Sequence, residues 1–329
     1  PHLYKVDGKY LLSAAEGGTG PQHSQVILIA KSPLGPFTPH PDNPILTQRD
    51  LPEDRAEPIT SVGHADFTQD SEDNWWAVFL GTRPYQGNEY NTGRETFLMP
   101  VSWDNGIPRI TKPGDVIPHV IDRPALPAQP KAPLPLTGNF TYTDEFEEEV
   151  LPLHWLTVRI PAQKAYRLEN GELVLEARAD GVGSPGQPSF LARGQQHTNA
   201  EAYTEVSFVP GDNDDEAGIA AFQNDVAYYA LGLSMSEDGK AIVRLRKRAG
   251  DATDKDGEIV AEVPAATPLG ASLKLRIVSR GPEIDFYQAA RGDDWEPVAL
   301  SEDSTILSTE KAGGFVGTLL GVYAQSAGD

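Results

Sequence analysis

The chain has 329 residues, of which 48 are acidic and 27 basic, and its formal net charge is −21. This charge argues against nucleic acid and anionic membranes as partners, whereas an uncharged ligand such as a sugar is compatible with it. The sequence contains no cysteine, which excludes disulfide scaffolds, thiolate catalysis and cysteine-based zinc sites. No apolar run approaches membrane-spanning length, and no signal peptide is visible.

The first residues read as a hairpin, with a strand near Leu3–Lys5, a turn at Asp7-Gly8 and a second strand from Tyr10. Because the chain opens inside such a hairpin, we expect that the beginning of a domain is missing. The length suggests about two domains, and the 31 glycines and 28 prolines indicate many turns and an all-β fold.

Residues 1–112 are predicted to form short strands separated by turns, without a convincing helix. The expected strands are Val26–Ala30, Val62–Thr68, Trp75–Leu80 and Glu95–Trp103. Short strands at this spacing are typical of a sandwich, a barrel or the blades of a propeller.

Residues 113–138 are predicted to be a linker, because seven prolines occur between Pro113 and Pro135. Residues 139–329 are predicted to form an antiparallel β-sandwich, beginning with a strand and an acidic turn within Phe140–Trp155. Apolar and charged residues alternate clearly in Ala241–Arg246 and in Leu273–Ile277, as expected for strands with one buried face. A last strand is predicted over Gly314–Ala324. The acidic run Asp212–Glu216 lacks the spacing of an EF-hand loop, and we interpret it as a solvated turn.

Four groups of residues in the first region could form a sugar-binding site. Glu16 ends the apolar stretch YLLSAA and precedes Gly17 and Gly18. Partial burial at such a strand end would raise the pKa of a carboxyl group, as a general acid requires. The other groups are one histidine, one arginine and a set of aromatic residues: His64, Arg94, Phe37, Trp75, Trp76 and Tyr85. Arginine can donate to sugar hydroxyls, and aromatic rings can stack on pyranose faces. Each group by itself is more often structural.

Five motifs occur together in a fixed order: AAEGGTG, LGPFTPHPDNPILT, VGHADF, WWAVFLGTRP and TGRETFL. In this order they resemble the second half of the catalytic domain of glycoside hydrolase family 43, in its two-domain β-xylosidase / α-L-arabinofuranosidase branch. The region from DEFEEEVLPLHW to KAGGFVGTLLGVYA resembles the domain appended in that branch. The resemblance implies part of a five-bladed β-propeller in residues 1–112 and a concanavalin-like (jelly-roll) β-sandwich in residues 139–329.

The resemblance also implies roles for four residues. Glu16 matches the general acid, and Arg94 matches the arginine that binds sugar hydroxyls. His64 matches the motif histidine beneath the site, and Phe315 matches a sandwich aromatic that helps to close the pocket. The family's catalytic base and the aspartate that tunes the acid both precede the acid, so neither is assigned here; Asp7 and Asp66 do not fit these roles.

The implied activity is exo-acting, inverting hydrolysis of xylo-oligosaccharides by a β-1,4-xylosidase. The chain resembles a fragment cut at both ends, and we expect it to be inactive without the missing propeller segment. An α-L-arabinofuranosidase and a non-catalytic carbohydrate-binding protein remain as alternatives. No organic cofactor is expected; calcium at the propeller centre, an oligomer and the cellular location stay open, although the sequon Asn139-Phe140-Thr141 slightly favours secretion.

Overall fold

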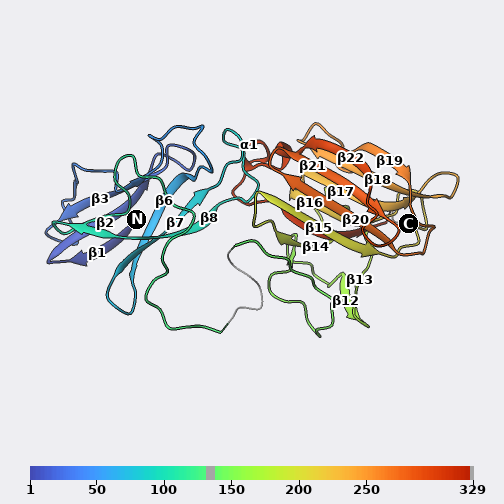
Figure 1. Ribbon diagram of the computed structural model, residues 1–329, viewed down its shortest axis with the longest axis horizontal. Coiled ribbons are helices and arrows are strands. Elements are labelled where there is room, and N and C mark those ends of the chain that lie inside the picture. The colour runs from blue at the N-terminus through green and yellow to red at the C-terminus, as the bar shows by residue number, and fades with distance from the viewer. Residues whose placement is uncertain (131–137, 327–329) are drawn as a thin grey trace. The chain divides into compact units, whose positions relative to one another are not determined.

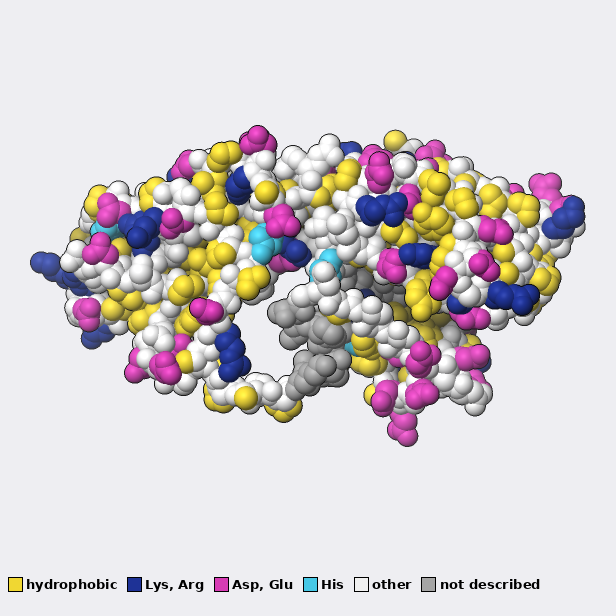
Figure 2. Space-filling model, in the orientation of Figure 1, with side chains coloured by type: hydrophobic (Ala, Val, Ile, Leu, Met, Phe, Trp, Pro, Cys, Tyr) yellow, Lys and Arg dark blue, Asp and Glu magenta, His cyan; other side chains and the backbone are white. Residues whose placement is uncertain are grey.

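A computed structural model describes residues 1–130 and 138–326 of the chain (Figure 1). The part of the expected linker at 131–137 and the last residues, 327–329, lie outside the described residues. The chain divides into two compact units, one of residues 1–88 and 94–137 and one of residues 89–93 and 138–329. Acidic side chains are spread over the visible surface of both units, in keeping with the net charge (Figure 2). Within the described ranges, no helix has the length and apolar character needed to cross a membrane.

The first unit consists of small antiparallel sheets. β3 pairs with β2, β4 and β5, and β1 continues the sheet beside β2; β6, β7 and β8 form a second sheet and β9 and β10 a third. The strands are β1 (His2–Val6), β2 (Lys9–Glu16), β3 (Ser24–Ala30), β4 (Thr38–Pro39), β5 (Leu46–Thr47), β6 (Thr60–Gln69), β7 (Trp75–Thr82), β8 (Glu95–Pro100), β9 (Ser102–Asp104) and β10 (Ile107–Arg109). The expected strand over Glu95–Trp103 is thus split between β8 and β9.

The expected first hairpin is confirmed. Asp7 and Gly8 have φ values of 49° and 75°, as a two-residue Asp-Gly hairpin turn requires. β2 then pairs with β3 along its whole length, which places Glu16 opposite Ser24. Apolar side chains from the sheets meet in one core, whose fully buried members include Leu11, Ile27, Ile45, Leu46, Ile59, Val62 and Phe79.

Asp70, in the turn between β6 and β7, is a buried carboxylate that organises this turn. Its oxygens accept hydrogen bonds from the Trp76 Nε1 at 3.0 Å, the Asn74 Nδ2 at 3.1 Å and the Glu72 backbone nitrogen at 2.9 Å. Burial alone would raise the pKa of Asp70, but these hydrogen bonds stabilise the ionised form and hold its pKa far below the usual range.

We expect Asp70→Asn to lower the melting temperature at pH 7, because an amide nitrogen would then face N–H groups whose hydrogen bonds the carboxylate now accepts. A depressed pKa in the folded state stabilises the fold above the unfolded pKa of about 4, and this stabilisation is lost as the pH falls below it. The difference in melting temperature between parent and variant should therefore narrow between pH 5 and pH 2. Asp73→Asn, at an exposed position of the same turn, is the control. A difference that does not change with pH would contradict the assigned role.

The second unit is a sandwich of two antiparallel sheets. The seven-stranded sheet has the order β11-β14-β23-β16-β17-β18-β19, and the four-stranded sheet the order β15-β20-β21-β22. The strands of the large sheet are β11 (Leu156–Thr157), β14 (Ser189–Gly194), β16 (Glu216–Asn224), β17 (Ala227–Met235), β18 (Ala241–Ala249), β19 (Glu258–Pro264) and β23 (Leu319–Gln325). Those of the small sheet are β15 (Asn199–Val206), β20 (Leu273–Arg280), β21 (Glu283–Ala289) and β22 (Glu296–Asp303). The hairpin of β12 (Tyr166–Glu169) and β13 (Glu172–Leu175) and the short helices η1 (Ser304–Leu307) and α1 (Thr309–Ala312) complete the unit.

The main core of this unit lies between the two sheets. One set of its side chains comes from β16 to β18 and the other from β20 to β22, as alternation along each strand requires. Fully buried members include Tyr229, Leu231, Leu233, Val243, Leu245, Leu275, Ile277 and Phe286. The alternation in Leu273–Ile277 therefore predicted the buried face correctly. In Ala241–Arg246 the core-facing residues were predicted correctly, but the expectation of a solvated opposite face was wrong, because Arg244 and Arg246 are buried as well.

Two strand expectations for this region were wrong, and one strand was missed. Phe140–Trp155 contains no strand. The last strand begins at Leu319 and not at Gly314, because Gly313 and Gly314 both have φ of 77° and interrupt an extended backbone. β22 was not predicted; buried and exposed positions do not alternate regularly along it, and its pairing with β21 contains register shifts.

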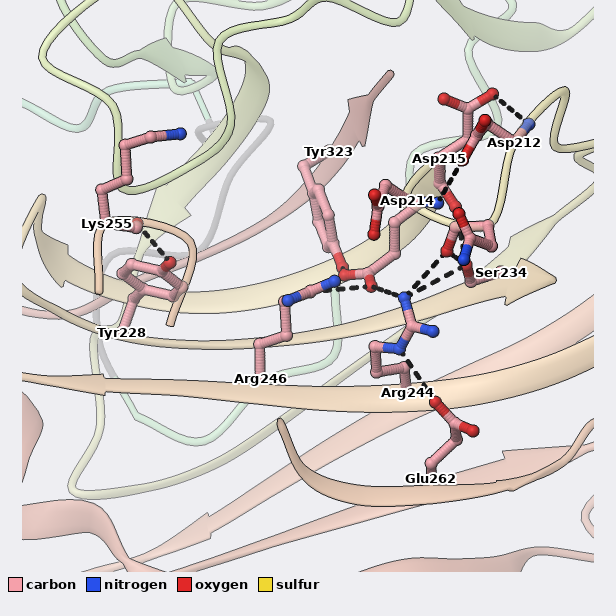
Figure 3. A network of polar contacts seen from close by, with 12 residues as sticks. Asp212, Asp214, Asp215, Tyr228, Ser234, Arg244, Arg246, Lys255, Glu262 and Tyr323 are labelled. Atoms are coloured by element: carbon pink, nitrogen blue, oxygen red, sulfur yellow. Dashed lines mark hydrogen bonds and ion pairs between the residues drawn. The ribbon is translucent and has the colours of Figure 1, made fainter. Parts of the chain in front are cut away.

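The opposite face of the large sheet carries a buried ionic network (Figure 3). Glu216 of β16 is completely buried and accepts hydrogen bonds from the Tyr323 hydroxyl and, at 3.1 Å, from the Arg246 Nε. Arg244 of β18 lies 3.9 Å from Glu216 and also donates at 3.1 Å to Glu262, which is partly exposed. β16 is thereby joined to β18 by paired charges and to β23 by the hydrogen bond from Tyr323.

Candidate functional site

Glu16 is the last residue of β2, beside the start of β3. The Ser24 hydroxyl donates to its Oε1 at 3.3 Å, and the Arg49 guanidinium lies 3.9 Å from the same oxygen. The Glu16 side chain is 50% exposed, so the partial enclosure expected from its apolar neighbours is weaker than the sequence suggested. The carboxyl group therefore stands at the rim of the first unit, open to a ligand.

The glycines after Glu16 are required by the turn that joins β2 to β3. Gly17 has a φ of 80°, and a Cβ atom there would lie 2.0 Å from the carbonyl oxygen of Gln22. No side chain is compatible with this approach. The turn closes with a hydrogen bond of 2.9 Å from the His23 nitrogen to the Gly20 carbonyl. The turn thus fixes His23 directly beside the end of β2.

His23 is a site residue that the sequence analysis missed. It is 3% exposed, and its Nδ1 lies 3.0 Å from the Ser61 carbonyl oxygen of β6. Burial lowers the pKa of His23, and the positive charge of Arg94 and the imidazole of His64 lower it further. His23 is therefore a neutral imidazole near the two side chains that the motifs had selected.

A buried glutamine fixes β3 to β6 on the other side of His64. Gln25, 1% exposed, accepts from the Ala65 backbone nitrogen at 3.0 Å and donates to the Ser13 hydroxyl at 2.6 Å. Because Ser13 belongs to β2, one amide group joins the strand of Glu16 to the strand of His64.

His64 lies at an irregularity of β6, where the pairing with β7 shifts between Gly63 and Asp66. Its φ is 58°, which is uncommon for a residue with a side chain and occurs preferentially at functional sites. Gly63 is also required, because a Cβ atom there would lie 2.6 Å from the His23 Nε2. In the Gly-His pair of the motif, Gly63 therefore leaves room for the ring of His23, and His64 presents an exposed imidazole.

Arg94 directly precedes β8 and is half-buried. The next residue, Glu95, receives two parallel hydrogen bonds of 2.7 Å from the Arg83 guanidinium. Such a forked pair is rigid, and it fixes the first residue of β8. In the first unit, the turn after Glu16 leads to His23, Gly63 beside His64 packs against its ring, and the positive charge of Arg94 acts on it.

Phe315 belongs to the second unit, in the loop between α1 and β23, and its side chain is 58% exposed. The loop is held from below by Gln223, whose Nε2 donates to the carbonyls of Gly313 at 3.1 Å and Val316 at 3.2 Å. The phenyl ring is therefore presented on an anchored loop and takes no part in the sandwich core. Its position as the aromatic that closes a pocket remains a prediction.

The five residues that precede Arg94, 89–93, are part of the second unit. The Thr318 nitrogen donates to the Asn91 carbonyl at 2.9 Å, and the Ser308 hydroxyl accepts from the Tyr90 nitrogen at 3.1 Å. Gly93 packs on Gly317 so closely that a Cβ atom on it would lie 2.4 Å from the Gly317 nitrogen. The segment is thereby bound to the same loop region that carries Phe315.

The calcium that the resemblance raised finds no matching donor set here. Within residues 1–130 and 138–326, no group of three or more histidine, aspartate or glutamate side chains is arranged to hold a metal ion. We therefore derive no role for a metal from these side chains.

Comparison with protein families gives two matches along the chain. Residues 1–108 match the model of glycosyl hydrolases family 43, and residues 143–329 match the β-xylosidase C-terminal concanavalin A-like domain.

Two curated relatives match the whole chain. The non-reducing end α-L-arabinofuranosidase of Bacteroides ovatus is 34% identical over 332 residues, which is 100% of this chain and 59% of the relative. The xylosidase/arabinosidase of Butyrivibrio fibrisolvens is 32% identical, again over 100% of this chain and 61% of the relative. The chain therefore spans about 60% of the length of these relatives.

Two solved structures are also similar to the chain over its whole length. The structure described as "Bacteroides ovatus Xyloglucan PUL GH43B" has a TM-score of 0.87 and 33% identity, over 100% of this chain and 62% of that one. The GH43 BlXynB protein from Bacillus licheniformis has a TM-score of 0.85 and 29% identity, over 100% and 61% of the two chains.

Proposed function

Because the chain belongs to glycosyl hydrolase family 43, with a β-propeller part followed by the concanavalin A-like domain, we propose that it supplies the general acid of an exo-acting β-1,4-xylosidase. The observation that carries the proposal is the surroundings of the buried His23: it follows the turn after Glu16, packs against β6 beside His64, and is affected by the positive charge of Arg94. Its substrates would be short xylo-oligosaccharides.

In this proposal Glu16 gives its proton to the oxygen of the leaving group. Its half-exposed position leaves the carboxyl group accessible to a sugar, and hydrogen bonds from Arg94 would hold hydroxyls of the terminal xylose. The neutral, buried His23 supports both groups from below and adds no charge to the site.

An inverting mechanism also needs a second carboxylate, roughly 6.5–9.5 Å from the acid, to activate water on the opposite face of the sugar. None of the carboxylates described above is assigned to this role. We therefore propose that the base belongs to the part of the relatives' length that residues 1–329 do not span.

The test compares residues 1–329 with a chain extended to the length of the relatives. We expect the extended chain to hydrolyse xylobiose and aryl β-D-xylosides, and residues 1–329 alone to show a small fraction of that activity. Proton NMR during the first turnovers should show α-xylose as the first product. A β-xylose product would overturn the inverting mechanism, and full activity of residues 1–329 alone would overturn the assignment of the base.

An α-L-arabinofuranosidase is the second candidate, favoured by the named activities of the relatives from Bacteroides ovatus and Butyrivibrio fibrisolvens. The ratio of kcat/KM on aryl α-L-arabinofuranosides to that on aryl β-D-xylosides separates the two. A ratio well above one would replace the xylosidase proposal.

A further inference from the structure

The outer face of the four-stranded sheet carries a row of side chains that the proposed hydrolysis does not use. Tyr203 of β15 pairs with Arg276 of β20, Arg276 with Tyr287 of β21, and Tyr287 with Pro297 of β22. Their neighbours Ile277 and Phe286 are completely buried in the sandwich core, so the row itself points outward. Three strand spacings give it a length of about 14 Å. We call these four residues and Trp295 the aromatic row.

The rings of the aromatic row are in contact with one another through Arg276. The Trp295 ring lies 6.3 Å from the Tyr203 ring at 63°, and the Arg276 guanidinium carbon lies 5.3 Å from the centre of the Trp295 ring and 5.9 Å from that of Tyr287. Guanidinium groups bind aromatic faces in this way. Arg276 therefore connects Tyr287 with Trp295, and the ring of Trp295 connects this pair with Tyr203.

This surface is exposed and held in place. Tyr203 is 57% exposed, and Tyr287 and Trp295 are half-buried. The Tyr287 hydroxyl donates at 3.1 Å to Asp285, which is 2% exposed and also accepts from the Ser301 nitrogen at 2.7 Å. Rings that are fixed before binding lose little conformational freedom when a ligand stacks on them.

The charges around the aromatic row favour an uncharged ligand. Arg276 forms an ion pair with Glu201, and Lys274 donates to the Gly292 carbonyl at 3.1 Å. The exposed carboxylates on the sheet and in the adjacent turn still outnumber the basic residues there, Lys274, Arg276, Arg280 and Arg291: they are Glu201, Glu205, Asp293, Asp294 and Glu296. An anionic polymer would be repelled here, whereas carboxylate oxygens can accept hydrogen bonds from sugar hydroxyls.

We propose that the aromatic row is a binding surface for an uncharged xylan chain, with the sugar rings stacked on Tyr203 and Trp295 and their hydroxyls donating to the neighbouring carboxylates. The surface would keep the protein on the polysaccharide from which short substrates are released. The choice of xylan rests on the proposed function; the preference for an uncharged polysaccharide rests on the sheet alone.

Affinity electrophoresis in native gels that contain soluble neutral arabinoxylan tests the proposal without any measurement of hydrolysis. We expect retardation of the parent protein, at least tenfold weaker affinity for Tyr203→Ala and Trp295→Ala, and affinity near the parent value for Tyr203→Phe, which keeps the ring. Ile259→Ala, at a 50% exposed position of β19 in the other sheet, is the control and should bind normally. Melting temperatures show whether each variant is folded.

The proposal is overturned if the parent is not retarded, or if Ile259→Ala and Tyr203→Ala weaken binding equally. Sedimentation velocity tests whether this face is instead an interface between copies of the chain. If Tyr203→Ala changes the oligomeric state and leaves the retardation unchanged, the face is such an interface and the xylan surface is refuted. Retention by neutral mixed-linkage glucan but not by xylan would show that the surface binds a polysaccharide other than xylan, and would refute the choice of xylan. It would also count against xylan as the source of the substrates. Binding to xylan by an extended chain that does not hydrolyse xylobiose would refute the proposed function alone.

Discussion

Glu16→Gln is expected to lower kcat/KM on xylobiose by roughly 10²–10⁴-fold, the usual contribution of a general acid. The loss should be much smaller on an aryl xyloside with a good leaving group, because such a group departs with little help from a proton. The comparison is made in the extended chain that hydrolyses both substrates, and the measured quantity is the ratio of the two losses.

The same variant distinguishes catalysis from a structural role. If Glu16 only pairs with Arg49 at the surface, its removal changes stability by less than about 1 kcal/mol and affects both substrates alike. Glu53→Gln, an exposed carboxylate of the same unit, controls for the loss of one negative charge. Equal losses on the two substrates would argue against Glu16 as the acid.

Glu216→Ala is expected to destabilise the second unit by about 3–5 kcal/mol, because it leaves Arg246 buried without its carboxylate partner. Glu216 is fully buried and receives Arg246 at 3.1 Å, and the hydroxyl of the buried Tyr323 would lose its acceptor too (Figure 3). Scanning calorimetry, which can resolve the two units, measures the change.

The matched control is Glu262→Ala. Glu262 pairs with Arg244 at 3.1 Å, and Arg244 also lies near Glu216, but the Glu262 side chain is 41% exposed. Water can replace it, so its loss should change the stability by less than about 1 kcal/mol. A loss for Glu216→Ala no larger than that for Glu262→Ala would refute the structural importance of the buried network.

Local sequence was sufficient wherever a feature depends on neighbouring residues. The Asp7-Gly8 turn, the alternation in Leu273–Ile277 and the glycines after Glu16 each follow from backbone freedom or strand periodicity. The ordered motifs also indicated the family that the comparisons show. These properties are determined within a few residues of the chain.

Local sequence was insufficient where charge or exposure interrupts the pattern. In β22 the pairing is irregular and buried and exposed positions do not alternate, so its sequence does not show the pattern of a strand. The apolar residues before Glu16 suggested a buried carboxyl group, yet the side chain lies at a strand end and is half exposed. Alternation predicts which face of a strand is buried, but it does not predict the exposure of residues at the ends of the strand.

By itself, then, the sequence determined an all-β chain, its turns, and the motif residues Glu16, His64 and Arg94. Only the tertiary structure decided that His23 and Gln25 join β3 to Ser61 and Ala65, about 40 positions further along the chain. It likewise decided that Tyr203, Arg276 and Tyr287 form one row. The reason is that strand order and register bring distant residues together, and they are selected by the packing of the whole sheet and not by any short segment.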